Sequence, residues 1–185
     1  MNSTASVGGD ERLRLFLALR LPDDVVDQVE RWQRERLGSG VRVVPRGHLH
    51  VTLAFLGHRP AGELESIVGV LRDAAAGAGA IRLKPVRYRE TRSVGMLVLS
   101  DDEGRTARLA GDVQERLEQL GVYRREDRAA WLPHLTVARW RERPRLQLDP
   151  PPVRTFVPSD AAAYLSRLHP GGARYEVLES VALGG

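Results

Sequence analysis

Two short motifs of the same form stand out in the sequence, His50-Val51-Thr52-Leu53 and His134-Leu135-Thr136-Val137. Residues two apart in a β-strand point to the same face. Each motif therefore places an imidazole beside a hydroxyl and turns its two apolar residues toward a core. One such pair is weak evidence, because threonine is common in strands and short motifs match by chance. Two pairs in two apolar strands are much harder to explain by chance and point to chemistry.

Two histidines with two hydroxyls suit the cleavage of a phosphodiester. One histidine activates a nucleophile and the other protonates the leaving oxygen, and an unperturbed pKa of about 6.5 allows either role near neutral pH. The hydroxyls of Thr52 and Thr136 can donate hydrogen bonds to the non-bridging phosphate oxygens. The similarity of the motifs lets the roles exchange, so the sequence does not separate acid from base. Our working assignment is His134 as the base and His50 as the acid.

Arg139 is the candidate cation for such a site. It follows His134 by five residues, so strict alternation would put it on the opposite face of the strand. A bulge or the end of the strand would turn it into the site, and the alternative is an exposed arginine at a strand terminus. Trp131, close to His134, is the candidate for stacking on a base, with core packing as its alternative. We expect Phe16 and Phe55 to pack in the core.

The elements that must position these residues follow from apolar periodicity and from turn residues. We expect Gly57–Pro60 to end the first motif strand, and the proline-rich stretch after the second motif to be an extended surface loop. The helices should begin at residues 23, 63 and 101 and end by residues 38, 75 and 121, the last one burying Leu109, Val113, Leu117 and Leu120. The expected strands are 12–20, 41–44, 50–56, 81–83, 86–90, 96–100, 134–139, 153–157, 161–166 and 175–182.

Strands outnumber helices in this pattern, and several are joined by short turns. That favours an α+β fold with antiparallel sheets over a doubly wound parallel sheet. The order indicates two similar halves, each with a long helix and a strand that begins with histidine. We expect a flexible N-terminal tail over residues 1–11 and a single domain over residues 12–185, a length that buries a sizeable core.

Composition narrows the class of protein further. The 185 residues include no cysteine, which excludes disulfides, thiolate nucleophiles and cysteine-ligated metals and is compatible with the cytoplasm, where we expect the protein. No apolar run approaches the roughly 20 residues of a spanning helix, so we expect no membrane contact. The net charge is +4 and the pI about 10.1, but Lys84 is the only lysine, and an excess of arginine indicates an anionic partner only weakly. Nothing in the sequence requires more than a monomer.

The residues around both motifs resemble the two-histidine (2H) phosphoesterase superfamily. Within it they are most similar to the bacterial and archaeal RNA 2',3'-cyclic phosphodiesterases, also called the 2'-5' RNA ligase family. The similarity runs from Arg14–Leu19 through His48–Gly57 to Pro133–Arg139 and so covers most of the chain. It implies a bilobal α+β fold with a pseudo-twofold axis, in which two mostly antiparallel sheets are flanked by helices and each gives one motif strand to a central groove.

The resemblance also implies an activity. The family hydrolyses a 2',3'-cyclic phosphate at an RNA end to a 2'-phosphate, and the weak reverse reaction makes a 2'-5' bond. Carried over by position, His50 and His134 are the catalytic pair, and Thr52, Thr136 and Arg139 bind the phosphate. The expected partner is RNA with a cyclic phosphate end, such as a tRNA fragment, or a cyclic nucleotide. No cofactor and no metal are implied.

Three departures from the family pattern leave substrate preference open. His48 stands where asparagine is common, Ala129 where arginine is common with Arg128 one place off, and Trp131 where phenylalanine is common. Another 2H phosphodiesterase acting on a different cyclic nucleotide or linkage is therefore an alternative.

Two readings outside the family also compete. His48 and His50 have a spacing found in metal sites, but further carboxylate or histidine ligands do not follow them. A non-catalytic RNA-binding module would stack bases on aromatic side chains such as Trp131, Trp140, Tyr123 and Phe55. Such a module has no need for two His-x-Thr pairs.

Overall fold

The computed structural model describes residues 11–125 and 131–184. The predicted tail lies outside these residues except for Glu11, whose carbonyl oxygen accepts a hydrogen bond of 2.9 Å from the Ala61 amide. Arg128 and Ala129, where the sequence departs from the family pattern, also lie outside the described residues.

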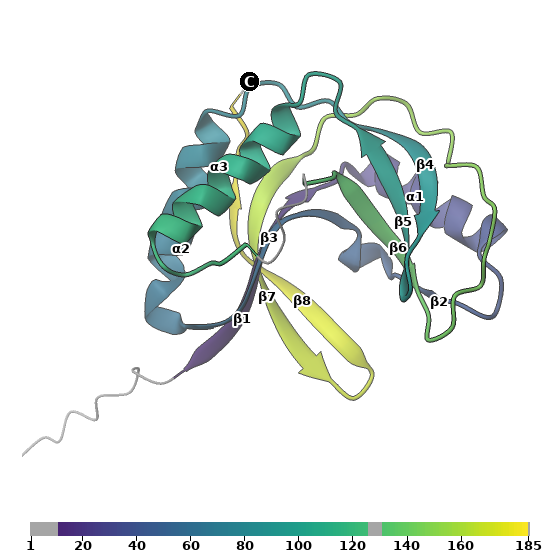
Figure 1. The fold of residues 1–185 in the computed structure, drawn as a ribbon, viewed down its shortest axis with the longest axis horizontal. Coiled ribbons are helices and arrows are strands. Elements are labelled where there is room, and N and C mark those ends of the chain that lie inside the picture. The colour runs from purple at the N-terminus through teal and green to yellow at the C-terminus, as the bar shows by residue number, and fades with distance from the viewer. Residues whose placement is uncertain (1–10, 126–130, 185) are drawn as a thin grey trace, which may run out of the picture.

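Two four-stranded antiparallel sheets form the frame (Figure 1). The two motif strands contact each other where the sheets meet. This confirms the expected α+β fold with two antiparallel sheets. The first sheet has the order β3 (His50–Pro60), β1 (Arg12–Arg20), β7 (Asp160–His169), β8 (Gly172–Val181), and the second β2 (Arg42–Val43), β6 (His134–Arg139), β5 (Val94–Ser100), β4 (Lys84–Glu90).

Three α-helices cover the sheets in the described part of the chain. Helix α1 (Asp23–Arg36) begins with two aspartates and ends with arginines, which suits the helix dipole, and packs Trp32 against Tyr88 of β4. Helices α2 (Leu64–Ala76) and α3 (Arg105–Gln119) lie side by side over the sheet of β1 and β3 (Figure 1). Two short 3₁₀ helices, η1 (Arg46–His48) and η2 (Ala61–Glu63), flank β3.

The lobes do not follow the two halves of the sequence. Strand β1 pairs with β7 from the other end of the chain, and α1 packs on the sheet that contains β6. Each half of the sequence does hold a long helix and a strand that begins with histidine, as expected, but α1 of the first half packs on the sheet of β6 and α3 of the second half contacts β3. The two halves of the sequence therefore do not form one lobe each.

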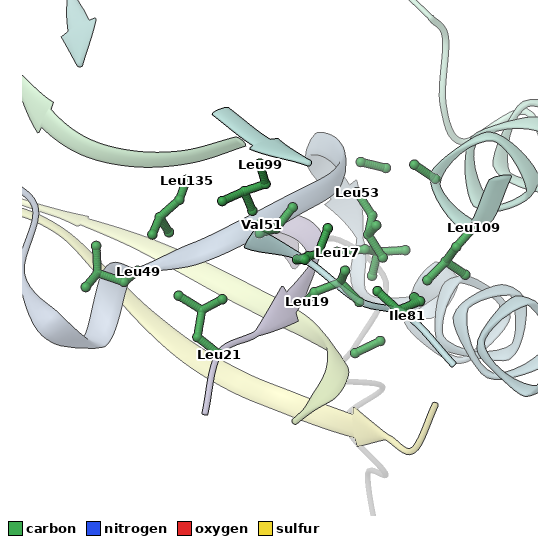
Figure 2. Packing of buried hydrophobic residues seen from close by; sticks show 14 of the residues in the cluster. Leu17, Leu19, Leu21, Leu49, Val51, Leu53, Ile81, Leu99, Leu109 and Leu135 are labelled. Atoms are coloured by element: carbon green, nitrogen blue, oxygen red, sulfur yellow. The ribbon is translucent and has the colours of Figure 1, made fainter. Parts of the chain in front are cut away.

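One cluster of buried side chains joins the two sheets and the three helices. In Figure 2, Leu17 and Leu19 of β1 lie beside Val51 and Leu53 of β3, with Leu135 and Leu99 of the other sheet close by. The apolar residues of both motifs are at most 1% exposed, as the alternation predicted. None of the described helices is long and apolar enough to cross a membrane.

Several predicted boundaries were wrong. Strand β3 does not end at Gly57 but continues to Pro60, because Gly57 adopts a φ of 68° and the ladder with β1 resumes beyond it. Residues 81–83 and 153–157 are not strands, and only one antiparallel bridge joins Leu83 to Phe156. The proline-rich stretch between β6 and residue 153 has no regular structure, as expected. Within it, the carbonyl oxygen of Asp149 accepts a hydrogen bond from the indole of Trp32.

The predicted start of α3 was wrong, and its predicted end is confirmed. The helix begins at Arg105 rather than at Asp101, since Gly104 before it has a φ of 65° that no α-helix continues. It ends at Gln119, and Gly121 follows at a φ of 71°, which confirms the predicted stop. Leu109, Val113 and Leu117 are buried as predicted, but Leu120 is 46% exposed because it lies past the last turn.

Candidate active site

A cavity of about 360 Å³ lies between the two sheets. Four of the predicted site residues line it: His50 and Thr52 from β3, and Thr136 and Arg139 from β6. The chain beyond the motifs completes the wall, with Arg14, Phe16, Phe55, Arg42, His48 and Tyr175 among its residues.

Two predicted residues are not in this lining. His134 lies just outside it, two residues before Thr136 on the same strand face, and is near enough for its charge to lower the pKa of His50. Trp131 is partly buried against the main core and does not reach the cavity. Base stacking by Trp131 stays a prediction without support from its position.

The ring of His50 is enclosed by aromatic side chains. Its centroid lies 4.9 Å from that of Phe16 and 5.7 Å from that of Tyr175, and its Nε2 is 3.1 Å from Thr52 Oγ1. The pKa of His50 is lowered to about 4, mainly by burial and also by the charges of His48, His134 and Arg139, while a hydrogen bond with the His48 backbone acts in the opposite direction. At neutral pH this ring is therefore uncharged in the free protein.

Both motif histidines use the backbone two residues earlier in the chain. His134 Nδ1 lies 2.9 Å from the carbonyl oxygen of Leu132. A carbonyl only accepts, so Nδ1 carries the proton and Nε2 is left for a substrate. The His50 ring forms a hydrogen bond with the backbone of His48, and this bond raises the pKa of the ring. A bond that favours the protonated ring is one that the ring donates to a carbonyl oxygen. The two imidazoles thus have matching orientation at equivalent positions.

A β-bulge follows each motif threonine. In β6, Thr136 pairs with Met96 and Ala138 with Gly95, which leaves Val137 as an extra residue. In β3, Thr52 pairs with Ala18 and Ala54 with Leu17, which leaves Leu53 extra. Such a residue shifts the alternation of the strand by one.

The bulges decide which later side chains reach the cavity. Arg139 lines it instead of pointing to the opposite face, as the bulge hypothesis anticipated. Phe55 holds the equivalent place in β3, five residues after His50, and is 48% exposed on the cavity. Its predicted core position was wrong. The matching spacing of Phe55 and Arg139 from their histidines is the sequence signal that could have placed it.

The charged groups in the cavity wall are cationic. Arg14, Arg42 and Arg139 line the cavity, and none of them forms an ion pair with a carboxylate of residues 11–125 or 131–184. Arg42 and Arg139 are direct partners across β2 and β6, and like charges placed opposite each other are unfavourable. Burial and these same two arginines lower the pKa of His48. The site is thus arranged for an anion that offsets the repulsion.

Sequence reasoning missed Arg14, Arg42 and Tyr175. The Arg14 guanidinium donates to Ser166 Oγ at 2.7 Å and lies 4.7 Å from the centre of the Phe55 ring. Tyr175 stacks on His48 at 4.1 Å. None of the three belongs to a motif, and only the pairing of distant strands brings them to the cavity. In the described part of the chain, no three or more histidine, aspartate or glutamate side chains gather as a metal would require.

Comparison with known proteins identifies the family of the chain. The model of the 2'-5' RNA ligase superfamily matches residues 21–168. The chain belongs to this superfamily. Among its members, a protein of Thermus thermophilus named RNA 2',3'-cyclic phosphodiesterase is 30% identical over 188 residues, covering 94% of this chain and 91% of its own length. One of the same name from Archaeoglobus fulgidus is 33% identical over 130 residues, covering 69% and 72%.

Solved structures show that the fold is that of the superfamily. A Thermus thermophilus crystal structure superposes with a TM-score of 0.78 at 29% identity, covering 94% of this chain and 99% of the other. Escherichia coli LigT complexed with 3'-AMP gives a TM-score of 0.81 at 22% identity, covering 95% and 100%. The two-sheet arrangement with a central site is therefore a LigT-like fold.

Proposed function

We propose that this protein is an RNA 2',3'-cyclic phosphodiesterase that hydrolyses the cyclic phosphate at an RNA end to a 2'-phosphate. The observation that carries the proposal is the meeting of His50, Thr52 and Thr136, from two motif strands, on one cavity with cationic walls. The curated relatives bear the name of this activity. Together these features favour catalysis on a phosphodiester over mere binding of RNA.

The cyclic phosphate would lie between the two motif strands. Thr52 and Thr136 donate hydrogen bonds to its non-bridging oxygens, and Arg139 supplies a charge-assisted bond. These donors are held by strands of two sheets, and the Thr52 hydroxyl, which lies 3.1 Å from His50 Nε2 in the free protein, turns to the phosphate when the substrate binds. They stabilise the additional negative charge that the phosphorus centre carries in the transition state.

Proton transfer is the task of the two histidines. One takes a proton from water as the water oxygen attacks phosphorus, and the other gives a proton to O3' as the P–O3' bond breaks. The phosphate then remains on O2'. When the 5'-hydroxyl of a second RNA attacks in place of water, the same breaking of the P–O3' bond leaves a 2'-5' bond, which is the 2'-5' ligase activity.

The lowered pKa of His50 bears on which ring is the base. At pH 7 a ring with a pKa of about 4 is protonated in about one molecule in a thousand. This favours His50 as the base in the free protein, the reverse of the assignment made from the sequence. The pH dependence of kcat/KM decides between them: it rises through pH 4 when His50 is the base and falls above pH 4 when His50 is the acid.

The test of the function is a single assay on a short RNA that ends in a 2',3'-cyclic phosphate, with excess chelator present. Wild type should produce the 2'-phosphate isomer. His50→Ala and His134→Ala should each lower the rate by about 10²–10⁴. His169→Ala, at the exposed end of β7, is the matched control and should keep full activity.

Other results would assign another function. A 3'-phosphate product would keep the two-histidine chemistry but place the protein in another branch of the 2H phosphoesterases. Binding of the RNA by wild type and both histidine variants without turnover would make it an RNA-binding module. Activity lost on chelation and restored by zinc would show that a metal is required.

A further inference from the structure

Two buried glutamines contact the two bulges. Gln33 of α1 and Gln114 of α3 are 1% and 6% exposed. Gln33 Nε2 donates to the carbonyl oxygen of Val137 at 2.9 Å and to that of Val44 at 3.0 Å. Gln114 Nε2 donates to the carbonyl oxygen of Leu53 at 2.8 Å. Val137 and Leu53 are the extra residues of the bulges in β6 and β3.

The arrangement is the same in both lobes, although the helices are not equivalent in chain order. In each case a helix places a glutamine amide on the carbonyl between the motif threonine and the next cavity-facing side chain. That side chain is Arg139 in β6 and Phe55 in β3. Neither glutamine lines the cavity, so neither can touch a substrate there.

Core packing alone does not account for Gln33. A buried amide costs free energy unless it is hydrogen-bonded, and Gln33 Oε1 has no partner among the described residues. An apolar side chain of similar size would avoid that cost. The Val137 carbonyl also accepts the backbone N–H of Val44, so the amide is not its only partner. What the amide adds is a bridge from α1 to the carbonyl oxygens of both Val137, in the β6 bulge, and Val44, at the end of β2.

We propose that Gln33 and Gln114 are positioning residues that hold the two bulges in register. A bulge is a local irregularity, and a strand that lost it would return to simple alternation. Without the Gln33 bridge, Arg139 would turn away from the cavity. Without Gln114, the same would happen to Phe55. Each glutamine thereby keeps one side chain of the cavity wall in place. This role goes beyond the proposed reaction and depends on it only for the kinetic test.

The kinetic test uses Gln33→Met, which keeps the length of the side chain but removes the amide. The expected loss of kcat/KM on the cyclic phosphate RNA is about 10- to 100-fold, the scale of a displacement of about 1 Å in a site. Val29→Ala, one turn earlier on α1 and fully buried, is the control for a destabilised helix. It should leave kcat/KM within about threefold, since a cavity in the core acts on stability. Equal losses in the two variants would overturn the proposal.

A double-mutant cycle separates the two glutamines. Arg139→Gln should cost much less in Gln33→Met than in wild type, because the guanidinium no longer faces the phosphate. The same replacement should cost its full amount in Gln114→Met, which acts on the other bulge. Independent, additive effects of Gln33 and Arg139 would contradict the proposal. If Gln33→Met cannot be purified, the cycle of Gln114→Met with Phe55→Leu tests whether a glutamine holds the equivalent bulge in β3.

A readout without catalysis keeps this inference apart from the proposed function. In wild type, cross-strand NMR contacts should join Gly95 to Ala138, as the register requires. In Gln33→Met we expect Gly95 to pair with Val137 in an appreciable fraction of molecules. An unchanged register would overturn the inference even in a protein that hydrolyses cyclic phosphates. A changed register would support it even in one that does not.

Discussion

Acid should destabilise this protein through His50. The pKa of its ring lies at about 4 instead of 6.5, first because the ring is buried and then because His48, His134 and Arg139 lie near. That difference corresponds to about 3 kcal/mol in favour of the neutral ring. In the unfolded chain the ring titrates at about 6.5, so the unfolded state binds the proton first as the pH falls. The native state therefore loses stability from pH 6.5 down to about pH 4, and this loss is absent above pH 6.5.

The free energy of unfolding, measured in urea at pH 7 and pH 4.5, tests this in wild type and in His50→Gln. Between these two pH values the contribution of His50 falls by about 2.5 kcal/mol. Wild type should lose that much more than the variant, because glutamine does not titrate. Groups that titrate in both proteins cancel in the comparison. His169→Gln, which replaces an exposed histidine, should follow wild type.

Equal losses of stability in wild type and His50→Gln would refute the reasoning. So would an NMR titration in which the His50 ring takes up its proton near pH 6.5. Either result would mean that the ring is better hydrated than its contacts with Phe16 and Tyr175 indicate. The preference for His50 as the base would then lose its support.

Three further changes test other parts of the structure. Arg139→Gln removes a charge-assisted hydrogen bond and should raise KM for a cyclic phosphate RNA about 10- to 100-fold in steady-state kinetics. Gly95→Ala would bring a methyl group within 2.8 Å of the Trp140 ring, and should lower the free energy of unfolding in urea by about 1–3 kcal/mol. Glu90→Ala deprives the Leu146 amide of its acceptor at 2.7 Å and should speed hydrogen exchange at that amide. An unchanged KM, stability or exchange rate would contradict the respective account.

The motif strands could be predicted because their pattern is local. Alternation within β3 and β6 is enough to bury Val51 and Val137 and to pair His50 with Thr52 on the other face. Alternation cannot predict a bulge, because the position of the extra residue depends on the strand that pairs with it. From the sequence, Arg139 could therefore lie in the site or be exposed at the end of the strand, and only the pairing of β6 with Gly95 and Met96 decides between the two positions.

Long-range pairing set the remaining limits. Gly57 looks like the end of a strand, but β1 provides partners on both sides of it and the ladder continues. Phe55 looks like a core residue, and only the register of β3 against β1 turns it to the cavity. Arg14 and Arg42 belong to different sheets and meet only in the tertiary structure. Nothing in the sequence indicates that these two arginines face the same cavity.

The position of β1 inside its sheet has a consequence for synthesis. Arg20 of β1 pairs with Asp160 of β7, 140 residues later, so one edge of β1 has no partner until most of the chain has left the ribosome. Such a high separation of contacts slows folding, and an unpaired strand edge invites association with other chains meanwhile. Tyr175, which closes the cavity over His48, is made later still. The nascent protein thus acquires both motifs before β7 and Tyr175 are made, and its site is complete only at the end, so turnover would report that folding is finished.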